Sequence, residues 1–191
     1  MNKLETAVGA IDRYNRQDPV LFQWNGESWP QEYFFSLRVC EWIERLSPDA
    51  GEELLLAARA HHIGRWEIPR DQYPDGKAGY LNWRKRLAEL HAEKAGAILE
   101  EAGYLPAQRE RVKELILKKQ LKSDPEVQLL ENALCLVFLQ YQYEDFRQKH
   151  PKEKVVHILR KSLRKMDGQG REEALKLDYS EQGLVCIREA I

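Results

Sequence analysis

Leu54-Leu55-Leu56-Ala57-Ala58-Arg59-Ala60-His61-His62-Ile63 is the stretch of sequence that decides the fold. Its leucines and alanines predict a helix over residues 51–63 that is apolar on its inward side and packs closely at the centre of the molecule. The helix closes on a pair of histidines, and His91 belongs to the next long helical stretch. Imidazole is the commonest protein ligand for metals and titrates near neutrality, so this clustering predicts a functional site.

Further helices are predicted on both sides of this stretch, because apolar residues recur at three- and four-residue steps. One covers residues 31–46, before the central helix. The others cover residues 80–102, where an interruption near Leu90 and His91 is one alternative, and residues 109–119, 126–146 and 154–166. Gly168-Gln169-Gly170 predicts a break before a short tail. Strand signals are almost absent, so the sequence predicts an all-α fold.

The length of 191 residues predicts one domain, with a core over residues 10–170 and a C-terminal tail over residues 171–191. Folding of a chain of this size buries roughly 70% of the surface that the unfolded chain exposes. That burial is enough to hold the structure without disulfides or a structural metal. A bound metal would therefore serve chemistry.

Charge is nearly balanced, with 30 basic and 31 acidic residues and a net charge of -1. This balance argues against a nonspecific nucleic-acid binder, and we expect neither nucleic acid nor a membrane among the partners. Two basic clusters survive inside the balance: Lys118-Lys119 with Lys122, and Arg160-Lys161 with Arg164-Lys165. Each could bind phosphate or form an ordinary solvated helix face.

The three cysteines, Cys40, Cys135 and Cys186, are far apart and stand in apolar contexts. We expect reduced core thiols, because this spacing offers neither a disulfide framework nor a CxxC metal site. The first residues lack the apolar core of a signal peptide, and no stretch approaches the roughly 20 apolar residues of a membrane helix. The expectation is a soluble, cytoplasmic protein, and its oligomeric state stays open.

Arginine and aromatic residues are dense between Gly64 and Gly79, in a loop long enough to be functional. Arg65, Trp66 and Arg70 could hold a phosphate or stack on a base, because guanidinium matches phosphate oxygens and indole offers a π-face. The alternative is a packed loop with Trp66 in the core and the arginines in solvent.

Three other cations are candidates for binding an anion. Arg59 stands in a nearly apolar helix, where a cation is costly unless it pairs with an acid or an anionic ligand, and we expect it to point to the site. Lys119 and Lys122 could bind phosphate directly, with an exposed basic face as the alternative. The predicted ligand is a small anionic or phosphorylated molecule.

The segment Leu56-Ala57-Ala58-Arg59-Ala60-His61-His62-Ile63-Gly64, followed by the stretch from His91 to Gly103 and by residues 126–139, resembles the layout of HD-domain phosphohydrolases. The first segment is similar to that family's apolar-Ala-Ala-x-x-His-Asp-Ile-Gly, with His62 in place of the aspartate. The resemblance implies an HD-like helical bundle. In that family the three segments supply ligands for one or two metals that activate water against phosphate esters.

A second set of segments carries a closer resemblance: Arg59-Ala60-His61-His62-Ile63, Arg65-Trp66-Glu67-Ile68-Pro69-Arg70, Tyr73-Pro74, Gly79-Tyr80-Leu81, Trp83-Arg84, His91-Ala92-Glu93-Lys94, Lys122-Ser123-Asp124-Pro125-Glu126 and Cys135-Leu136-Val137-Phe138-Leu139. Through these segments residues 10–175 resemble a family of bacterial and fungal proteins classed only as a domain of unknown function. That resemblance implies no particular activity, and the relation to catalytic HD enzymes is distant.

Several positions depart from the HD pattern. Phe35 stands where the first histidine is expected, although Glu32 lies one turn earlier on a similar face. Lys119 replaces another expected histidine. Asn132, beside Glu131, stands at the position of the final aspartate. A full two-metal site is therefore not expected.

The resemblance leaves a mixed set of ligands for one divalent metal: Glu32, His61 or His62, His91 and Glu131. Neighbouring helical residues lie about 100° apart, so we expect only one member of the histidine pair to face a metal. Manganese, iron, nickel and zinc all suit such ligands, and spacing does not choose among them. Both glutamates have a plainer alternative as solvent-facing acids in the first part of a helix.

The leading hypothesis is a divergent HD-like, metal-dependent hydrolase of a small phosphorylated or nucleotide-like molecule. Its anion would be held mainly by Arg59, Arg70 and Lys119. One rival is a non-catalytic anion- or nucleotide-binding module on the same scaffold, which the changed metal positions favour. A third hypothesis is a scaffold protein whose histidines are structural.

Overall fold

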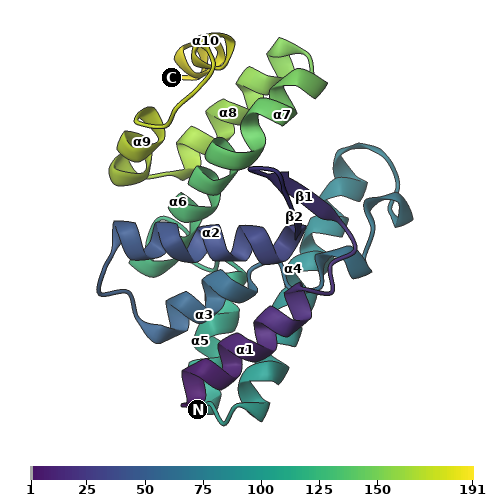
Figure 1. The fold of residues 1–191 in the computed structure, drawn as a ribbon, viewed down its shortest axis with the longest axis vertical. Coiled ribbons are helices and arrows are strands. Elements are labelled where there is room, and N and C mark those ends of the chain that lie inside the picture. The colour runs from purple at the N-terminus through teal and green to yellow at the C-terminus, as the bar shows by residue number, and fades with distance from the viewer. Residues whose placement is uncertain (1) are drawn as a thin grey trace. The chain divides into compact units, whose positions relative to one another are not determined.

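Helices make up nearly all of the regular structure in residues 2–191, which are the residues that the computed structural model describes (Figure 1). The all-α prediction is confirmed. The fold divides into two compact units, of which the first ends at Lys119 and the second is Gln120–Ile191. The single-domain organisation stays a prediction.

The first unit holds the central helix and its neighbours. Its elements are α1 (Lys3–Asn15), β1 (Leu21–Trp24), β2 (Glu27–Pro30), α2 (Gln31–Leu46), α3 (Glu52–Ala60), α4 (Gly76–Glu101) and α5 (Pro106–Ile116). The second unit is helical throughout its regular structure. Its elements are α6 (Pro125–Val137), α7 (Tyr143–Lys149), α8 (Lys152–Lys165), α9 (Gly168–Leu175) and α10 (Glu181–Ala190).

Helix α3 lies at the centre of the first unit, in contact with α1, α2, α4 and α5. Its inward side chains are at most 1% exposed, and three of them are alanines that let neighbouring backbones approach: Leu54, Leu56, Ala57, Ala58 and Ala60. The predicted central position is confirmed. The helix ends at Ala60, earlier than predicted, and Gly64 then takes a left-handed φ of 71° that redirects the chain.

Two predicted helices differ from the observed ones. Helix α4 runs for 26 residues without a break, so the alternative of an interruption near Leu90 and His91 is wrong. The long helix predicted over residues 126–146 is α6 and α7, joined by a π-helical turn at Phe138–Gln142. The pattern of apolar residues is continuous across this turn, which explains why the sequence did not reveal it.

The residues predicted as a glycine break and a tail are also helical. Asp167 caps α9 by accepting a hydrogen bond from the Gly170 N–H at 2.9 Å, so the glycines start a helix. Helix α10 follows and packs against α8 within the second unit. Residues 171–191 therefore contribute to the core of that unit, where Cys186 and Ile187 are buried.

A small antiparallel hairpin of β1 and β2, which the sequence did not predict, leads into α2. Asn25 and Gly26 form its turn with left-handed φ values of 51° and 80°, as a type I′ turn requires. Phe22 packs on Phe34 and Phe35 of α2, with ring centroids 4.8 Å apart in both pairs. The hairpin thus fixes the start of α2, where Glu32 lies.

Within the described residues, no helix has both the length and the apolar character needed to cross a membrane. The cysteines are free thiols, as predicted, and Cys135 and Cys186 are buried. Burial raises the pKa of the Cys40 thiol to about 11, so this group stays protonated at neutral pH. Cys40 is therefore not poised as a thiolate nucleophile by these surroundings.

Candidate metal centre

Glu32, His61 and His62 converge where the start of α2 meets the end of α3. One ligand atom from each residue lies within 4.8 Å of the others, and the two imidazole rings have centroids 4.3 Å apart. The expectation that only one histidine of the pair could face a common point assumed a continuing helix. Because α3 ends at Ala60, the pair lies in the turn that follows, where both rings reach the same place.

His91 extends this group from α4. Its ring centroid lies 5.4 Å from that of His62, and only 3% of the residue is exposed. We call Glu32, His61, His62 and His91 the His–Glu cluster. The sequence predicted Glu32, His91, Glu131 and one histidine of the pair as a set of ligands; the structure places both histidines beside Glu32 and His91.

Backbone carbonyls orient two of the imidazoles. His61 Nδ1 lies 2.7 Å from the carbonyl oxygen of Ala58, and His91 Nδ1 lies 2.7 Å from that of Ile63. A carbonyl oxygen can only accept, so each Nδ1 carries the proton and donates it. Each Nε2 is therefore left with its lone pair, which is the arrangement found in metal-binding histidines.

His62 is the most accessible member of the cluster. Its Nδ1 lies 3.2 Å from Glu32 Oε2, and 30% of its side chain is exposed, against 4% for Glu32. A carboxylate oxygen accepts this hydrogen bond, which again leaves Nε2 with a lone pair. The cluster thus meets solvent at His62.

Glu32 is held inside the first turn of α2 and is 3% exposed, so the alternative that it faces solvent is wrong. Its backbone N–H donates to Asp18 Oδ2 at 2.9 Å, and Arg65 Nε lies 3.5 Å from Oε1. Burial raises the pKa of the Glu32 carboxyl, and the charge of Arg65 opposes this rise in part. A cation in the cluster would oppose it further.

The histidines of the cluster are held in the neutral form. Burial is the largest cause, and it lowers the pKa of His61 and His62 well below the ordinary value and that of His91 to about 4. The positive charges of Arg65, Arg84 and Lys118 lower the pKa of His62 further. Neutral imidazole is the form that ligates metals. The same three cations give this edge of the cluster a positive field that favours anions.

Four cations predicted to bind an anion have partners inside the fold. Arg59 forms a two-point ion pair with Asp12 of α1, at 2.5 and 2.7 Å, so an acid and not a ligand accounts for its place in an apolar helix. Arg70 donates to the carbonyls of Tyr73 and Pro74 at 2.7 and 2.9 Å. Lys119 forms ion pairs with Glu110 and Glu114. Lys122 donates to the backbone carbonyls of residues 165 and 166.

Arg65 is the predicted cation that the structure places beside the cluster. Besides its approach to Glu32, its guanidinium lies over the ring of Trp83, 5.2 Å from the centroid. Trp66 instead packs on Tyr14 of α1, with ring centroids 5.8 Å apart. Within this loop, Trp66 is therefore a packing residue, whereas Arg65 borders the cluster.

Glu131 belongs to the second unit, on α6. It is 1% exposed, so it does not face solvent, and Lys165 Nζ lies 3.0 Å from its Oε1. The Cys135 thiol is 3.8 Å from the same oxygen. Both of these neighbours belong to its own unit.

Asp18 is a residue that the sequence did not single out. It is 4% exposed, and its carboxylate accepts hydrogen bonds from the N–H groups of Val20 and Glu32, each at 2.9 Å. Asp18 and Glu32 are 14 positions apart in the sequence, and the hairpin of β1 and β2 lies between them. The Asn25-Gly26 turn was the one signal in the sequence that could have revealed this link.

The chain matches the model of a family described as Domain of unknown function (DUF4202) over residues 5–187. No curated protein and no solved structure gives a significant match to the chain.

Proposed function

The chain belongs to this family of unknown function, and from the geometry of the His–Glu cluster we propose that it binds one divalent metal ion and hydrolyses a small phosphorylated or nucleotide-like molecule. The distant relation to HD-domain phosphohydrolases, the family's range in bacteria and fungi, and a cytoplasmic location are parts of the same proposal.

The observation that carries the proposal is the orientation of the histidines. Two carbonyl oxygens and one carboxylate engage Nδ1 of His61, His91 and His62. Three neutral imidazoles thus keep Nε2 free to ligate, beside one buried carboxylate. Metal-ligating histidines use this arrangement, in which the other ring nitrogen donates to a carbonyl or a carboxylate. Manganese, iron, nickel or zinc fits such a set of nitrogen and oxygen ligands.

A metal ion held by Glu32 and the histidines would supply an activated water for attack on a phosphate ester. The protein's own groups would do the rest. His62, as the most exposed member, borders the side from which substrate would enter. Arg65 stands beside the cluster to hold the phosphate, and the charges of Arg84 and Lys118 strengthen the attraction of this edge for an anion.

Elemental analysis of the purified protein tests the metal. We expect about one manganese, iron, nickel or zinc ion per wild-type chain, and loss of that ion in His62→Ala and His91→Ala. His157→Ala is the matched control, because His157 is an exposed histidine on α8, in the other unit. Absence of stoichiometric metal in the wild type, both as purified and after addition of these four metals, would overturn the proposal.

A second candidate is a non-catalytic anion-binding module, favoured by the histidine at position 62 where the HD pattern has an aspartate. Hydrolysis of p-nitrophenyl phosphate and nucleoside monophosphates by the metal-loaded protein separates the two. The hydrolase predicts turnover that His62→Ala and Arg65→Gln reduce. Phosphate binding that Arg65→Gln weakens, without turnover of any of these compounds, would establish the binding module instead.

A further inference from the structure

A groove in the second unit gathers arginines over an apolar floor. It has a volume of about 220 Å³ and lies among α8, α9 and α10. The residues that define it are Arg160, Leu163, Arg164, Arg171, Leu175 and Ile191. We call it the arginine groove. Two of its arginines, Arg160 and Arg164, come from the basic cluster noted in the sequence and lie one turn apart on α8.

The positive charge of the arginine groove is not neutralised by neighbouring acids. Arg160 donates to the carbonyl oxygen of Glu189 at 2.9 Å, and Arg171 donates to that of Asp167 at 3.2 Å. A neutral carbonyl orients a guanidinium without cancelling its charge. Arg164 has no hydrogen bond or ion pair with any residue in the described part of the chain. A guanidinium has five N–H donors, so most donors of the three remain available.

Three acids near the groove in sequence, Glu189, Glu173 and Asp167, are engaged elsewhere, and Glu172 is an exposed acid that forms no ion pair with the groove arginines in the described part of the chain. The Glu189 carboxylate pairs with Lys152 at 2.5 Å, and the Glu173 carboxylate pairs with Lys176 at 2.7 Å. The Asp167 carboxylate caps α9 and accepts from Asn132 at 2.8 Å. No side-chain carboxylate in the described part of the chain therefore forms an ion pair with the three guanidinium groups that line this groove.

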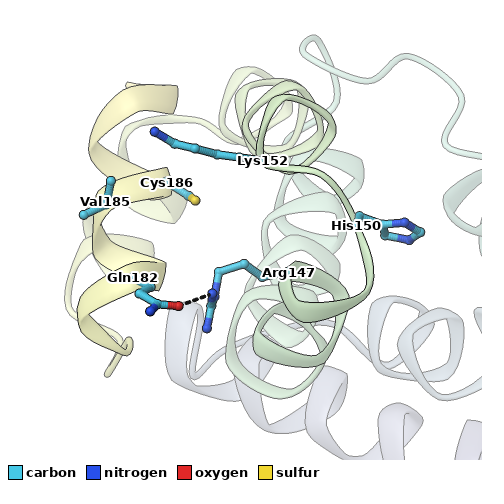
Figure 2. A pocket seen from close by; sticks show the side chains of 6 residues that line it. All are labelled: Arg147, His150, Lys152, Gln182, Val185 and Cys186. Atoms are coloured by element: carbon cyan, nitrogen blue, oxygen red, sulfur yellow. Dashed lines mark hydrogen bonds between the residues drawn. The ribbon is translucent and has the colours of Figure 1, made fainter.

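A larger cavity in the second unit differs from the arginine groove in how its basic residues are paired. It has a volume of about 320 Å³ and is also basic, but Arg147 pairs with Glu144 at 2.9 Å and Lys152 pairs with Glu189. Figure 2 shows Arg147 reaching across to Gln182 of α10, while the ring of His150 points away from that helix. The charges of this cavity are satisfied by the protein, so it offers less to an anion than the arginine groove does.

The apolar part of the arginine groove is open to solvent. Leu163 forms its floor and is 7% exposed, whereas Leu175 is 54% exposed and Ile191 is 76% exposed. Exposed aliphatic side chains next to unneutralised guanidinium groups suit a ligand that has both an anionic and an apolar part. The groove is smaller than the roughly 300–1,000 Å³ of pockets for drug-sized ligands, so that ligand must be small.

We propose that the arginine groove binds a phosphate monoester that carries a short apolar group. The phosphate lies among Arg160, Arg164 and Arg171, and the apolar group covers Leu163 and Leu175. A phosphate monoester carries up to two negative charges near neutral pH, against one for a carboxylate, so three guanidiniums favour the phosphate. This site is independent of the His–Glu cluster and requires no metal.

Titration of the full chain with hexyl phosphate, followed by NMR, tests the proposal. We expect saturable shifts of groove residues, tighter binding of hexyl phosphate than of hexanoate or inorganic phosphate, and about tenfold weaker binding in Arg164→Gln. Lys161→Gln is the matched control, since it removes an exposed charge from the same helix outside the groove and should leave the affinity unchanged.

A second variant tests the contact with the apolar part of the ligand separately from the contact with its phosphate. Leu175→Ser should weaken hexyl phosphate binding and leave inorganic phosphate unaffected. The proposal fails if Arg164→Gln and Lys161→Gln reduce affinity equally, because the attraction would then be that of a basic helix face. It also fails if anionic phosphatidylserine vesicles bind the protein and hexyl phosphate does not compete, which would indicate a membrane surface as the partner.

Discussion

At the scale of single residues, His91 links the cluster to the pH dependence of stability. Its pKa of about 4 in the fold lies below the ordinary value of 6.5, because burial disfavours the charged form. At pH values between these two, the His91 imidazole is protonated in the unfolded chain and neutral in the folded chain. The free energy of unfolding should therefore fall as the pH decreases from about 6.5 to about 4, by up to about 3 kcal/mol for this group.

The variant His91→Asn isolates this contribution, because asparagine retains an N–H donor for the Ile63 carbonyl and does not titrate. Urea unfolding at several pH values should give a flatter pH dependence for His91→Asn than for the wild type. His157→Asn, which changes an exposed histidine, should keep the wild-type slope. Equal slopes in all three proteins would contradict the assignment of the effect to His91.

The sequence indicated candidate side chains for the site, but it did not indicate which residues those side chains contact. The histidines could be selected because three of them cluster near helix ends, and Glu32 because it lies one turn before the position of the first histidine in the HD pattern. The place of Arg59 had two explanations, an acid or a ligand, and only the structure names Asp12 as the partner. No local pattern links two residues 47 positions apart.

At the scale of elements, the start of α2 depends on a cap that comes from outside the helix. Pro30 provides no side-chain cap, and the Asp18 carboxylate accepts from the N–H of Glu32 instead. Asp18→Ala should lower the free energy of unfolding by about 1–3 kcal/mol, because it leaves the buried N–H of Glu32, and the part-buried N–H of Val20, without their acceptor. It should also reduce metal content, since Glu32 loses its anchor.

Chemical denaturation and elemental analysis measure the two effects. Asp49→Ala is the control, because Asp49 is an exposed acid in the same unit. An unfolding free energy for Asp18→Ala within about 0.5 kcal/mol of the wild type, the range of ordinary surface changes, would contradict the capping role.

The close packing of α3 gives a second prediction for an element. Ala60 is fully buried where the helix ends, next to the histidine pair. Ala60→Leu adds volume that this site does not have and should cost about 1–3 kcal/mol of stability by thermal or chemical unfolding. Ala78→Leu, at an exposed position of α4, should change stability little. A stable Ala60→Leu would mean that α3 can move to make space.

Helices were predictable from the sequence and their interruptions were not. Apolar periodicity placed α2 at residues 31–46, as observed. The same periodicity ran through the π-helical turn, and glycines suggested a break where Asp167 caps a new helix. Capping and turn geometry depend on side-chain hydrogen bonds that a pattern of apolar residues does not contain.

At the scale of the whole molecule, metal binding should raise stability through mass action. Metal present at 100 times its dissociation constant would add about 2.7 kcal/mol to the free energy of unfolding. We expect the melting temperature of the wild type to rise on addition of the cognate metal and to fall with chelator. His62→Ala should show neither change, whereas His157→Ala should behave as the wild type. If the melting temperature of the wild type stayed unchanged with every metal tested, this prediction would be contradicted.

The fold class followed from the whole sequence, but the arrangement of the site did not. Periodicity and the lack of strand signals predicted an all-α protein. The convergence of His61 with His62 required knowledge that α3 ends at Ala60, which depends on the turn at Gly64. The local sequence is compatible with a helix through Ile63, so tertiary packing decides where the helix stops.

The π-helical turn at Phe138–Gln142 has a consequence for the evolution of the chain length. Such a turn holds one residue more than an α-helix needs to cover the same path, so it can accommodate one extra residue within a helix. A chain that lacks one residue here could continue α6 as a regular helix over the same path, and the helix beyond would keep its direction. A one-residue difference in length between relatives at this point would therefore leave Tyr143 and the residues that follow facing the same neighbours.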